Sequence, residues 1–161
     1  MNISSDTASN RPRRARLRVL LADDDDSFRL LVGHWFTSSP ALRERAELHC
    51  VSDGSEVLRW LRGQDGYADR RAHPIPDLVL LDERMVRMDG TETLAGLKAD
   101  PRIAWLPVCL LSSSTSDDFP RRGYSEGASV CLSKPLSFDE LGGKLEKLVE
   151  FFYSVAALPD A

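Results

Sequence analysis

The stretch Pro76-Asp77-Leu78-Val79-Leu80-Leu81-Asp82 decides the fold of this chain. Its four consecutive apolar residues, 78–81, lie between turn-forming residues, and this pattern predicts a strand buried on both faces. The strand ends on a carboxylate, Asp82. Because functional groups gather just beyond the carboxyl ends of the strands in an open parallel α/β sheet, Asp82 stands where chemistry is expected.

Length and composition indicate one globular domain. The chain has 161 residues, of which 42% are hydrophobic and 29% are charged, and its formal net charge is −4. This balance supports a full hydrophobic core, and the negative charge argues against a general nucleic-acid-binding surface. No apolar run approaches the roughly 20 residues of a transmembrane helix, and the N-terminus has no apolar signal core. We therefore expect a cytoplasmic protein that contacts neither nucleic acid nor membrane.

The N-terminal residues 1–16 are predicted to form a disordered basic tail, ahead of a domain that spans residues 17–158. Residues 1–10 are mostly small and polar, and five arginines follow within positions 11–18. A basic run of this kind can contact nucleic acid or an acidic partner. A solvated tail that leads into the first strand is favoured, because no aromatic residues interleave the arginines.

Strand and helix patterns alternate five times along the chain. Apolar runs predict strands at residues 19–22, 78–82, 107–111 and 130–132, and the mixed apolar and polar residues 46–51 predict a further strand at an edge of the sheet. Helical spacing or helix-start signals follow each of them, at residues 27–36, 56–61, 91–99, 117–126 and from Ser137 onward. The fourth helix is expected to be polar or poorly ordered, because it contains Pro120 and Gly123. The alternation predicts a three-layer α/β domain with a parallel sheet, and a flavodoxin-like strand order of 2-1-3-4-5 would make the first and third strands neighbours.

Polar groups follow four of the five predicted strands. Asp23 and Asp24 follow the first strand, Asp82 ends the third, Ser112 follows the fourth and Lys134 the fifth. Each has an ordinary explanation when taken alone, such as an aspartate that forms a turn. Their occurrence at successive strand ends is a much more specific signal, and it predicts one shared site.

The run of four aspartates at residues 23–26 points to a bound cation. One or two of them can cap the following helix, since anions favour a helix N-terminus, but four exceed what a cap needs. Close carboxylates cannot comfortably all stay ionised without a cation, and ligands that are all oxygen select a hard ion such as Mg²⁺. With Mg²⁺ and the Lys134 ammonium to neutralise charge, and the Ser112 hydroxyl to donate a hydrogen bond, Asp82 can act as a nucleophile toward a phosphoryl group and form an acyl phosphate.

From about Arg18 to Leu158 the chain resembles the receiver domains of two-component response regulators. The resemblance rests on Leu-Leu-Ala-Asp-Asp, Pro-Asp-Leu-Val-Leu-Leu-Asp, Met-Asp-Gly, Leu-Pro-Val-Cys-Leu-Leu-Ser and Gly-Ala-Ser-Val-Cys-Leu-Ser-Lys-Pro. It implies a (βα)5 receiver fold and a phosphoprotein of phosphorelay signal transduction. Such a domain is not an enzyme with a separate substrate, because it catalyses only its own phosphoryl transfer and dephosphorylation.

The same resemblance implies a role for each residue of the predicted site. Three carboxylates and one backbone carbonyl would hold Mg²⁺, and they belong to Asp23, Asp24, Asp82 and Arg84. Asp82 would receive phosphate from the phosphohistidine of a histidine kinase, and Ser112 and Lys134 would contact the phosphoryl group. The long loop at residues 63–76, the serine run and the aromatic end of the last helix are similar to single-domain regulators that partner bacterial phytochromes. A bacteriophytochrome is therefore the kinase that this narrower resemblance implies.

The chain departs from the family pattern in the loop after the phosphoacceptor and at the switch. Leu-x-Met-Pro usually follows the phosphoacceptor, and this chain has Glu83-Arg84-Met85-Val86 instead. The switch residues would be Ser112 and Cys131, and the position of Cys131 is normally aromatic. Because a thiol cannot replace a ring that swings inward, we expect phosphorylation to be retained and its read-out to be altered or weak.

Two other function classes stay open on the sequence. One is a receiver-like interaction module with a degenerate switch, which works without phosphorylation. The other is a hydrolase that forms an aspartyl phosphate, which would need a second carboxylate two residues after its nucleophile. Arg84 occupies that place and speaks against the hydrolase.

Output is expected through protein contacts, with a homodimer formed through the last helix and strand. The inward stripe predicted for that helix consists of Leu141, Leu145, Leu148, Phe152 and Val155. Phe151, Tyr153 and Leu158 lie off this stripe and would give a second apolar face, which usually means an interface. The alternative is that these three residues complete the core of the domain itself.

Overall fold

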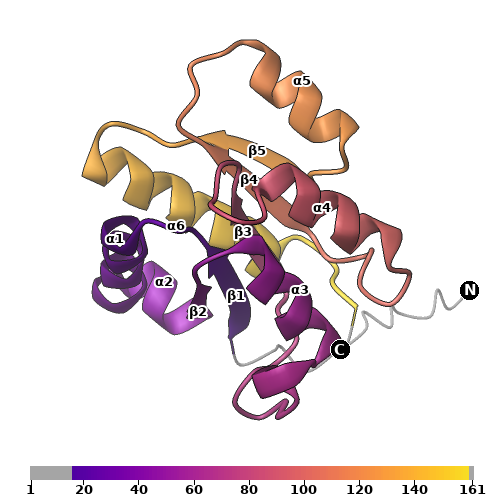
Figure 1. Cartoon of the computed structure of the whole chain (residues 1–161). Helices are drawn as coiled ribbons and strands as arrows, with labels where there is room; N and C mark the ends of the chain where they lie inside the picture. The colour runs from indigo at the N-terminus through magenta and orange to yellow at the C-terminus, as the bar shows by residue number, and fades with distance from the viewer. Residues whose placement is uncertain (1–15, 160–161) are drawn as a thin grey trace, which may run out of the picture.

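A parallel five-stranded sheet in the order β2-β1-β3-β4-β5 forms the middle layer of the protein (Figure 1). The strands are β1 (Leu17–Ala22), β2 (Ala46–Val51), β3 (Leu78–Asp82), β4 (Val108–Ser112) and β5 (Val130–Ser133). This computed structural model describes residues 16–159, so nearly all of the predicted basic tail lies outside the described residues. The predicted three-layer architecture and the strand order 2-1-3-4-5 are confirmed.

Two groups of helices cover the two faces of the sheet. α1 (Asp26–Ser38), α2 (Pro40–Arg45) and α6 (Phe138–Ser154) contribute to one core, and α3 (Gly54–Arg62), α4 (Gly90–Ala99) and α5 (Asp118–Ser125) to the other. Residues of β3 alternate between these cores, with Leu78 and Leu80 in the first and Val79 and Leu81 in the second. Because both faces of β3 are covered, its sequence is continuously apolar. The long loop before β3 contains a single 3₁₀ turn, η1 (Asp65–Tyr67).

Side-chain caps begin most of the helices. The Asp25 carboxylate accepts hydrogen bonds from the backbone N–H groups of Ser27 and Phe28, at 2.9 and 3.3 Å, and so begins α1. The Ser137 hydroxyl accepts from the Glu140 N–H at 3.4 Å and begins α6, as the capping-box spacing predicts. One of the four consecutive aspartates is therefore a helix cap, and Asp26 pairs with Arg29 within α1, which leaves Asp23 and Asp24 for the carboxylate cluster.

Two helices differ from the expectation. α2 was not predicted, because Ser39-Pro40 is also a signal for the end of a helix. Here Ser39 caps α2 by accepting from the Leu42 N–H at 3.4 Å, and Pro40 suits the first helical turn, where no N–H donor is needed. α5 is an ordered helix because Pro120 lies in its first turn and Phe119 anchors it in the core.

The end of α6 corrects part of the predicted apolar pattern. Val155 was expected to face the core but is 70% exposed, because α6 ends at Ser154 and the inward stripe ends with it. Tyr153 and Leu158 were expected on an exposed second face, but both are partly buried and pack against the core, as the alternative proposed. Phe151 alone of the three stays half exposed. Within residues 16–159, no helix combines the length and the apolar character needed to cross a membrane.

Candidate functional site

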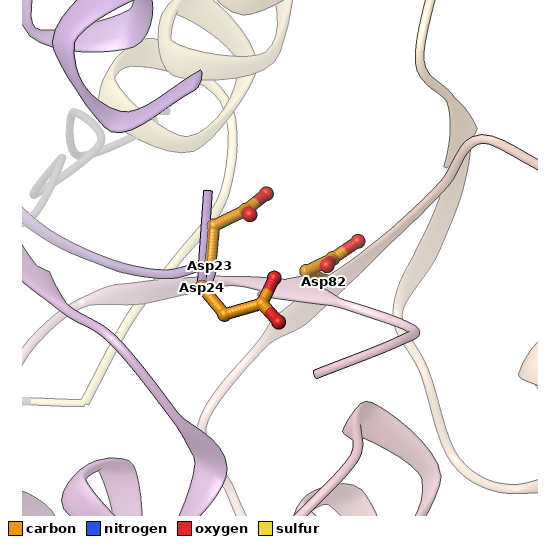
Figure 2. A group of neighbouring side chains, drawn as sticks. All are labelled: Asp23, Asp24 and Asp82. Atoms are coloured by element: carbon orange, nitrogen blue, oxygen red, sulfur yellow. The ribbon is translucent and has the colours of Figure 1, made fainter. Parts of the chain in front are cut away.

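Three aspartates meet at the carboxyl ends of two adjacent strands (Figure 2). Asp23 and Asp24 directly follow β1, and Asp82 is the last residue of β3, which pairs with β1. One carboxylate oxygen from each residue lies within 4.8 Å of those of the other two. Asp23 and Asp82 are buried, whereas Asp24 is exposed, so the cluster opens to solvent on one side.

Lys134 brings a positive charge into the cluster from the end of β5. Its Nζ atom lies 2.7 Å from Asp23 Oδ2 and 3.1 Å from Asp82 Oδ1. The Lys134 backbone N–H donates to the Ser112 carbonyl at 2.7 Å, and the ammonium lies 4.0 Å from the centre of the Phe28 ring. The backbone bond, the two ion pairs and a cation–π contact hold this side chain in place.

The electrostatics of the cluster favour a basic Asp82 carboxylate. Burial, and then the negative charges of Asp23 and Asp24, together raise the pKa of Asp82 to about 6, although the nearby Lys134 ammonium lowers it. Burial alone would lower the pKa of Lys134, but its hydrogen bond to Asp23 and the charges of Asp82 and Asp23 raise it. The lysine therefore stays a cation beside a carboxylate that is only partly ionised in the acidic range.

The predicted site residues line one hollow in the surface. Its lining consists of Asp23, Asp24, Asp25, Asp82, Glu83, Arg84, Ser112, Ser113, Ser114, Thr115 and Lys134. Arg84 is exposed at its rim. Cys131 does not line the hollow, so the structure brings together every predicted site residue except this one.

The donor set of the cluster fits a divalent metal ion. All three ligand candidates are carboxylates, and hard cations such as Mg²⁺ and Mn²⁺ prefer oxygen ligands. The Asp24 carboxylate also accepts a hydrogen bond from the Val86 N–H at 3.2 Å, which orients it. A proline at position 86 could not donate this bond.

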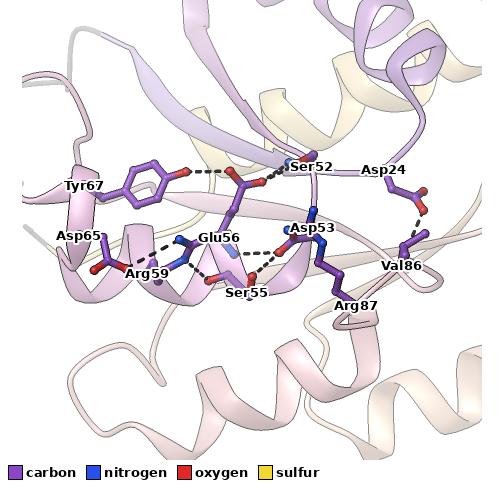
Figure 3. Close-up of polar contacts among 10 residues, drawn as sticks. All are labelled: Asp24, Ser52, Asp53, Ser55, Glu56, Arg59, Asp65, Tyr67, Val86 and Arg87. Carbon is purple, nitrogen blue, oxygen red and sulfur yellow. Dashed lines mark hydrogen bonds and ion pairs between the residues drawn. The ribbon is translucent and has the colours of Figure 1, made fainter.

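The loop between β3 and α4 is held at two points beside the carboxylates (Figure 3). Val86 donates to Asp24, and the Arg87 guanidinium pairs with the buried carboxylate of Asp53 at 3.4 Å. Arg87 has a left-handed backbone with φ of 71°, which a residue with a side chain seldom adopts. Asp53 also caps α3, by accepting from the Glu56 N–H at 3.1 Å. The two contacts tie the loop that follows Asp82 both to Asp24 and to α3.

A buried carboxylate next to Asp82 was missed by sequence reasoning. The Ser112 hydroxyl donates a hydrogen bond to the carboxylate of Glu83, and the Arg122 guanidinium of α5 donates to the other oxygen of the same carboxylate. The Glu83 side chain is only 7% exposed. The only signal in the sequence is an acidic residue directly after a buried strand, and nothing there identifies Arg122 as its partner.

Cys131 points toward α5 and is partly buried. Its Sγ atom lies 3.8 Å from the Pro120 carbonyl, and a Cβ added at Gly123 would lie 2.5 Å from that sulfur. The Cys131 N–H donates to the Tyr124 hydroxyl at 3.2 Å. A tyrosine of α5 thus contacts this strand position.

Comparisons with known proteins agree with this geometry. The probable methanogenesis regulatory protein FilR2 of Methanothrix harundinacea is 34% identical over 134 residues, which cover 83% of this chain and 82% of that protein. The solved structure of the phosphorylated cyanobacterial phytochrome response regulator RcpA is 29% identical, with a TM-score of 0.80 over 91% of this chain and 100% of that one. Response regulator RPA3017 in red light signalling of R. palustris is 33% identical, with a TM-score of 0.82 over 90% of this chain and 99% of that one.

A metal-bound structure is also similar. The Mn(2+)-bound form of response regulator Rcp1 is 26% identical, with a TM-score of 0.76 over 89% of this chain and 99% of that one. The sequence profile of the family described as response regulator receiver domain matches residues 19–146. The chain belongs to the response regulator receiver domain family, whose flavodoxin-like fold it adopts.

Proposed function

We propose that this receiver domain accepts a phosphoryl group on Asp82 from the phosphohistidine of a histidine kinase, in a reaction that depends on Mg²⁺. The observation that carries the proposal is the meeting of three carboxylates and one ammonium at neighbouring strand ends, with Lys134 Nζ 3.1 Å from Asp82 Oδ1. This arrangement offers a nucleophile, an open side for the donor and positive charge for the transferred group.

The chemistry assigns a task to each side chain. A carboxylate oxygen of Asp82 attacks phosphorus and forms the P–O bond of an acyl phosphate, while the P–N bond breaks and the histidine nitrogen leaves with the electron pair. The Lys134 ammonium and the Ser112 hydroxyl would donate hydrogen bonds to the phosphoryl oxygens. Mg²⁺, when bound by Asp23, Asp24, Asp82 and the Arg84 carbonyl, supplies further neutralisation of the phosphoryl charge.

Similar proteins support the choice of metal and partner. Receiver domains bind a divalent metal and partner with histidine kinases, and a similar structure holds Mn²⁺. Two of the similar structures are regulators of phytochrome or red-light signalling, which supports a kinase of the bacterial phytochrome class for this chain. Output would pass through protein contacts, including a homodimer through α6 and β5. The cytoplasmic location stays a prediction.

The proposal is tested with acetyl phosphate and Mg²⁺, a small donor that replaces the kinase. We expect the intact protein to gain the mass of one phosphoryl group in a base-labile bond. The gain should disappear in Asp82→Asn and when EDTA removes the metal. An adduct that persists in Asp82→Asn would place the acceptor elsewhere and refute the proposal.

The second candidate is a receiver-like module that works without phosphorylation. The contact that favours it is the hydrogen bond between Ser112 and Glu83, which engages the switch hydroxyl in another interaction. Such a module would bind its partner equally well before and after treatment with beryllofluoride and Mg²⁺, and it would gain no phosphoryl mass. The hydrolase alternative is not supported, because it needs a carboxylate two residues after Asp82 and Arg84 occupies that position.

A further inference from the structure

A buried ion pair connects the switch hydroxyl to helix α5. We propose that Glu83 is a positioning residue that competes with the phosphoryl group for the single proton of the Ser112 hydroxyl, and that its ion pair with Arg122 carries the outcome to α5. The inference rests on the proposed function of Asp82. It assigns a role to Glu83, which lies in the segment after Asp82 where the chain departs from the family pattern.

The contacts around Glu83 leave the Ser112 hydroxyl fully engaged. Its proton is donated to one Glu83 oxygen, and its oxygen accepts from the Ser114 N–H at 3.0 Å. The second Glu83 oxygen accepts from the Arg122 guanidinium. Because Glu83 is buried, its carboxylate needs these two donors as hydrogen-bond partners. A buried carboxylate without partners would destabilise the fold.

A hydroxyl has one proton to donate, so two acceptors cannot share it fully. Ser112 ends β4 next to Asp82 at the end of β3, where the two strands pair through Asp82 and Leu111. A phosphoryl group on Asp82 would offer anionic oxygens to the same hydroxyl. When Ser112 turns toward them, Glu83 loses one donor and keeps only its bond with Arg122.

Helix α5 is the element whose contacts would change when Glu83 loses the Ser112 hydrogen bond. Arg122 ties the helix to Glu83, and Tyr124, two residues later, accepts a hydrogen bond from the Cys131 N–H of β5. The position where the family usually places an aromatic switch residue is thus connected to α5. A change in the Glu83–Arg122 pair would be transmitted to the surface that α5 and β5 share, without any ring that swings inward.

Beryllofluoride with Mg²⁺ tests the competition, because it binds as a phosphoryl analogue without a kinase. Glu83→Gln should bind beryllofluoride about tenfold more tightly, because a neutral acceptor holds the Ser112 proton less strongly than a carboxylate. Arg122→Gln should bind it about fivefold more weakly, because Glu83 then keeps an uncompensated charge beside the site. General loosening of the structure would weaken binding in both variants, so the opposite signs identify the positioning role.

A double-mutant cycle separates the shared proton from simple charge repulsion. In a Ser112→Ala background, Glu83→Gln should improve beryllofluoride binding by less than about twofold, since the contested proton is gone. Glu92→Gln, which removes an exposed charge on α4, is the matched control and should leave binding unchanged. In ¹⁵N NMR spectra, beryllofluoride should shift the backbone N–H signals of α5 (all of residues 118–125 except Pro120) in the wild type, and these shifts should shrink in Glu83→Gln. Shifts that stay the same would remove the proposed transmission to α5.

The outcomes also distinguish this inference from the function on which it rests. A wild-type protein that binds no beryllofluoride at all would refute the proposed phosphoacceptor. A wild-type protein that binds normally, with Glu83→Gln unchanged or improved equally in the Ser112→Ala background, would refute only the role of Glu83. Arg122 is 42% exposed, so Arg122→Gln should fold even if Glu83→Gln does not, and the shifts that beryllofluoride causes in α5 should then shrink in Arg122→Gln; shifts equal to those of the wild type would refute the transmission through this pair.

Discussion

Asp82 carries a carboxyl group that costs the folded protein stability at neutral pH. Burial, followed by the charges of Asp23 and Asp24, raises its pKa from 3.8 to about 6 despite Lys134. The folded state therefore binds this proton more tightly than the unfolded chain does. Relative to neutral pH, this tighter proton binding stabilises the folded state. The stabilisation is fully present below pH 3.8 and is lost as the pH rises through 6.

Asp82→Asn should consequently stabilise the metal-free protein at neutral pH. A shift of this size corresponds to a difference in the free energy of unfolding on the order of 3 kcal/mol. Urea unfolding of both proteins in EDTA measures the difference, which should shrink by at least half between about pH 7 and about pH 4.5. A difference that does not depend on pH would mean that the Asp82 carboxyl is not perturbed in the fold.

Val86 offers a prediction about the metal site. Its N–H donates to Asp24 Oδ2 at 3.2 Å, and an exposed hydrogen bond of this kind helps to orient a ligand. Val86→Pro removes the donor, so Mg²⁺ affinity measured by calorimetry should fall about threefold. Val86→Ala keeps the N–H and is the matched control. If both variants bind Mg²⁺ like the wild type, the hydrogen bond does not position Asp24.

At the scale of the elements, the strands were the most predictable part of the fold. The predicted strands coincide with β1 to β5, and the signal is clearest in the inner strands β1, β3 and β4, because strands covered on both faces must be nearly continuously apolar. The helix α2 was not predictable with the same ease. Ser39-Pro40 is equally compatible with the end of one helix and the start of the next, and only the packing of Leu42 in the core favours a second helix.

The site was predictable where it depends on strand ends and unpredictable where it depends on side-chain partners. Asp23, Asp82 and Lys134 meet because the topology places their strand ends together. The pair formed by Glu83 and Arg122 joins residues 39 apart in the sequence through a helix whose orientation no local pattern specifies. Long-range pairs of this kind depend on the three-dimensional packing of α5.

The contact between α5 and β5 predicts the effect of restoring an aromatic residue at position 131. Gly123 and Pro120 leave no room beneath α5 for a ring, so the Tyr side chain of Cys131→Tyr should turn outward. We expect the rate of phosphorylation by acetyl phosphate to stay the same, because Cys131 does not line the hollow, while partner or dimer affinity changes. Crowding should lower the free energy of unfolding by about 1–3 kcal/mol.

Mass spectrometry of the phosphorylated fraction over time measures the rate, and urea unfolding measures the stability. Cys131→Ala is the control, because it removes the thiol without adding volume. A phosphorylation rate that falls in Cys131→Tyr but not in Cys131→Ala would show that the ring reaches the site. Unchanged affinity for partner and dimer in Cys131→Tyr would contradict the expected effect on output.

At the scale of the whole molecule, the surface near α6 is the place where a second copy would bind. Phe151 is 50% exposed and Val155 70% exposed, and the N–H of Val155, the residue after α6, donates to the Phe151 carbonyl at 2.9 Å, so the two residues lie close together at the end of the helix. Val130 and Leu132 of β5 pack against the same core as α6 and remain partly accessible. Exposed apolar side chains and the open edge of a sheet both favour association of two identical surfaces.

The homodimer is therefore expected to depend on Phe151 and Val155 rather than on Tyr153 and Leu158, which the core already covers. Phe151→Ser combined with Val155→Ser should shift the protein from dimer to monomer, with an increase in the dimer dissociation constant of at least about tenfold, because apolar burial drives such contacts. Sedimentation equilibrium over a range of concentrations measures this shift. Leu30→Ser removes an equally exposed apolar side chain from α1 and should leave the dimer intact. A wild-type protein that stays monomeric with and without beryllofluoride, or a double variant that dimerises like the wild type, would place the interface away from α6.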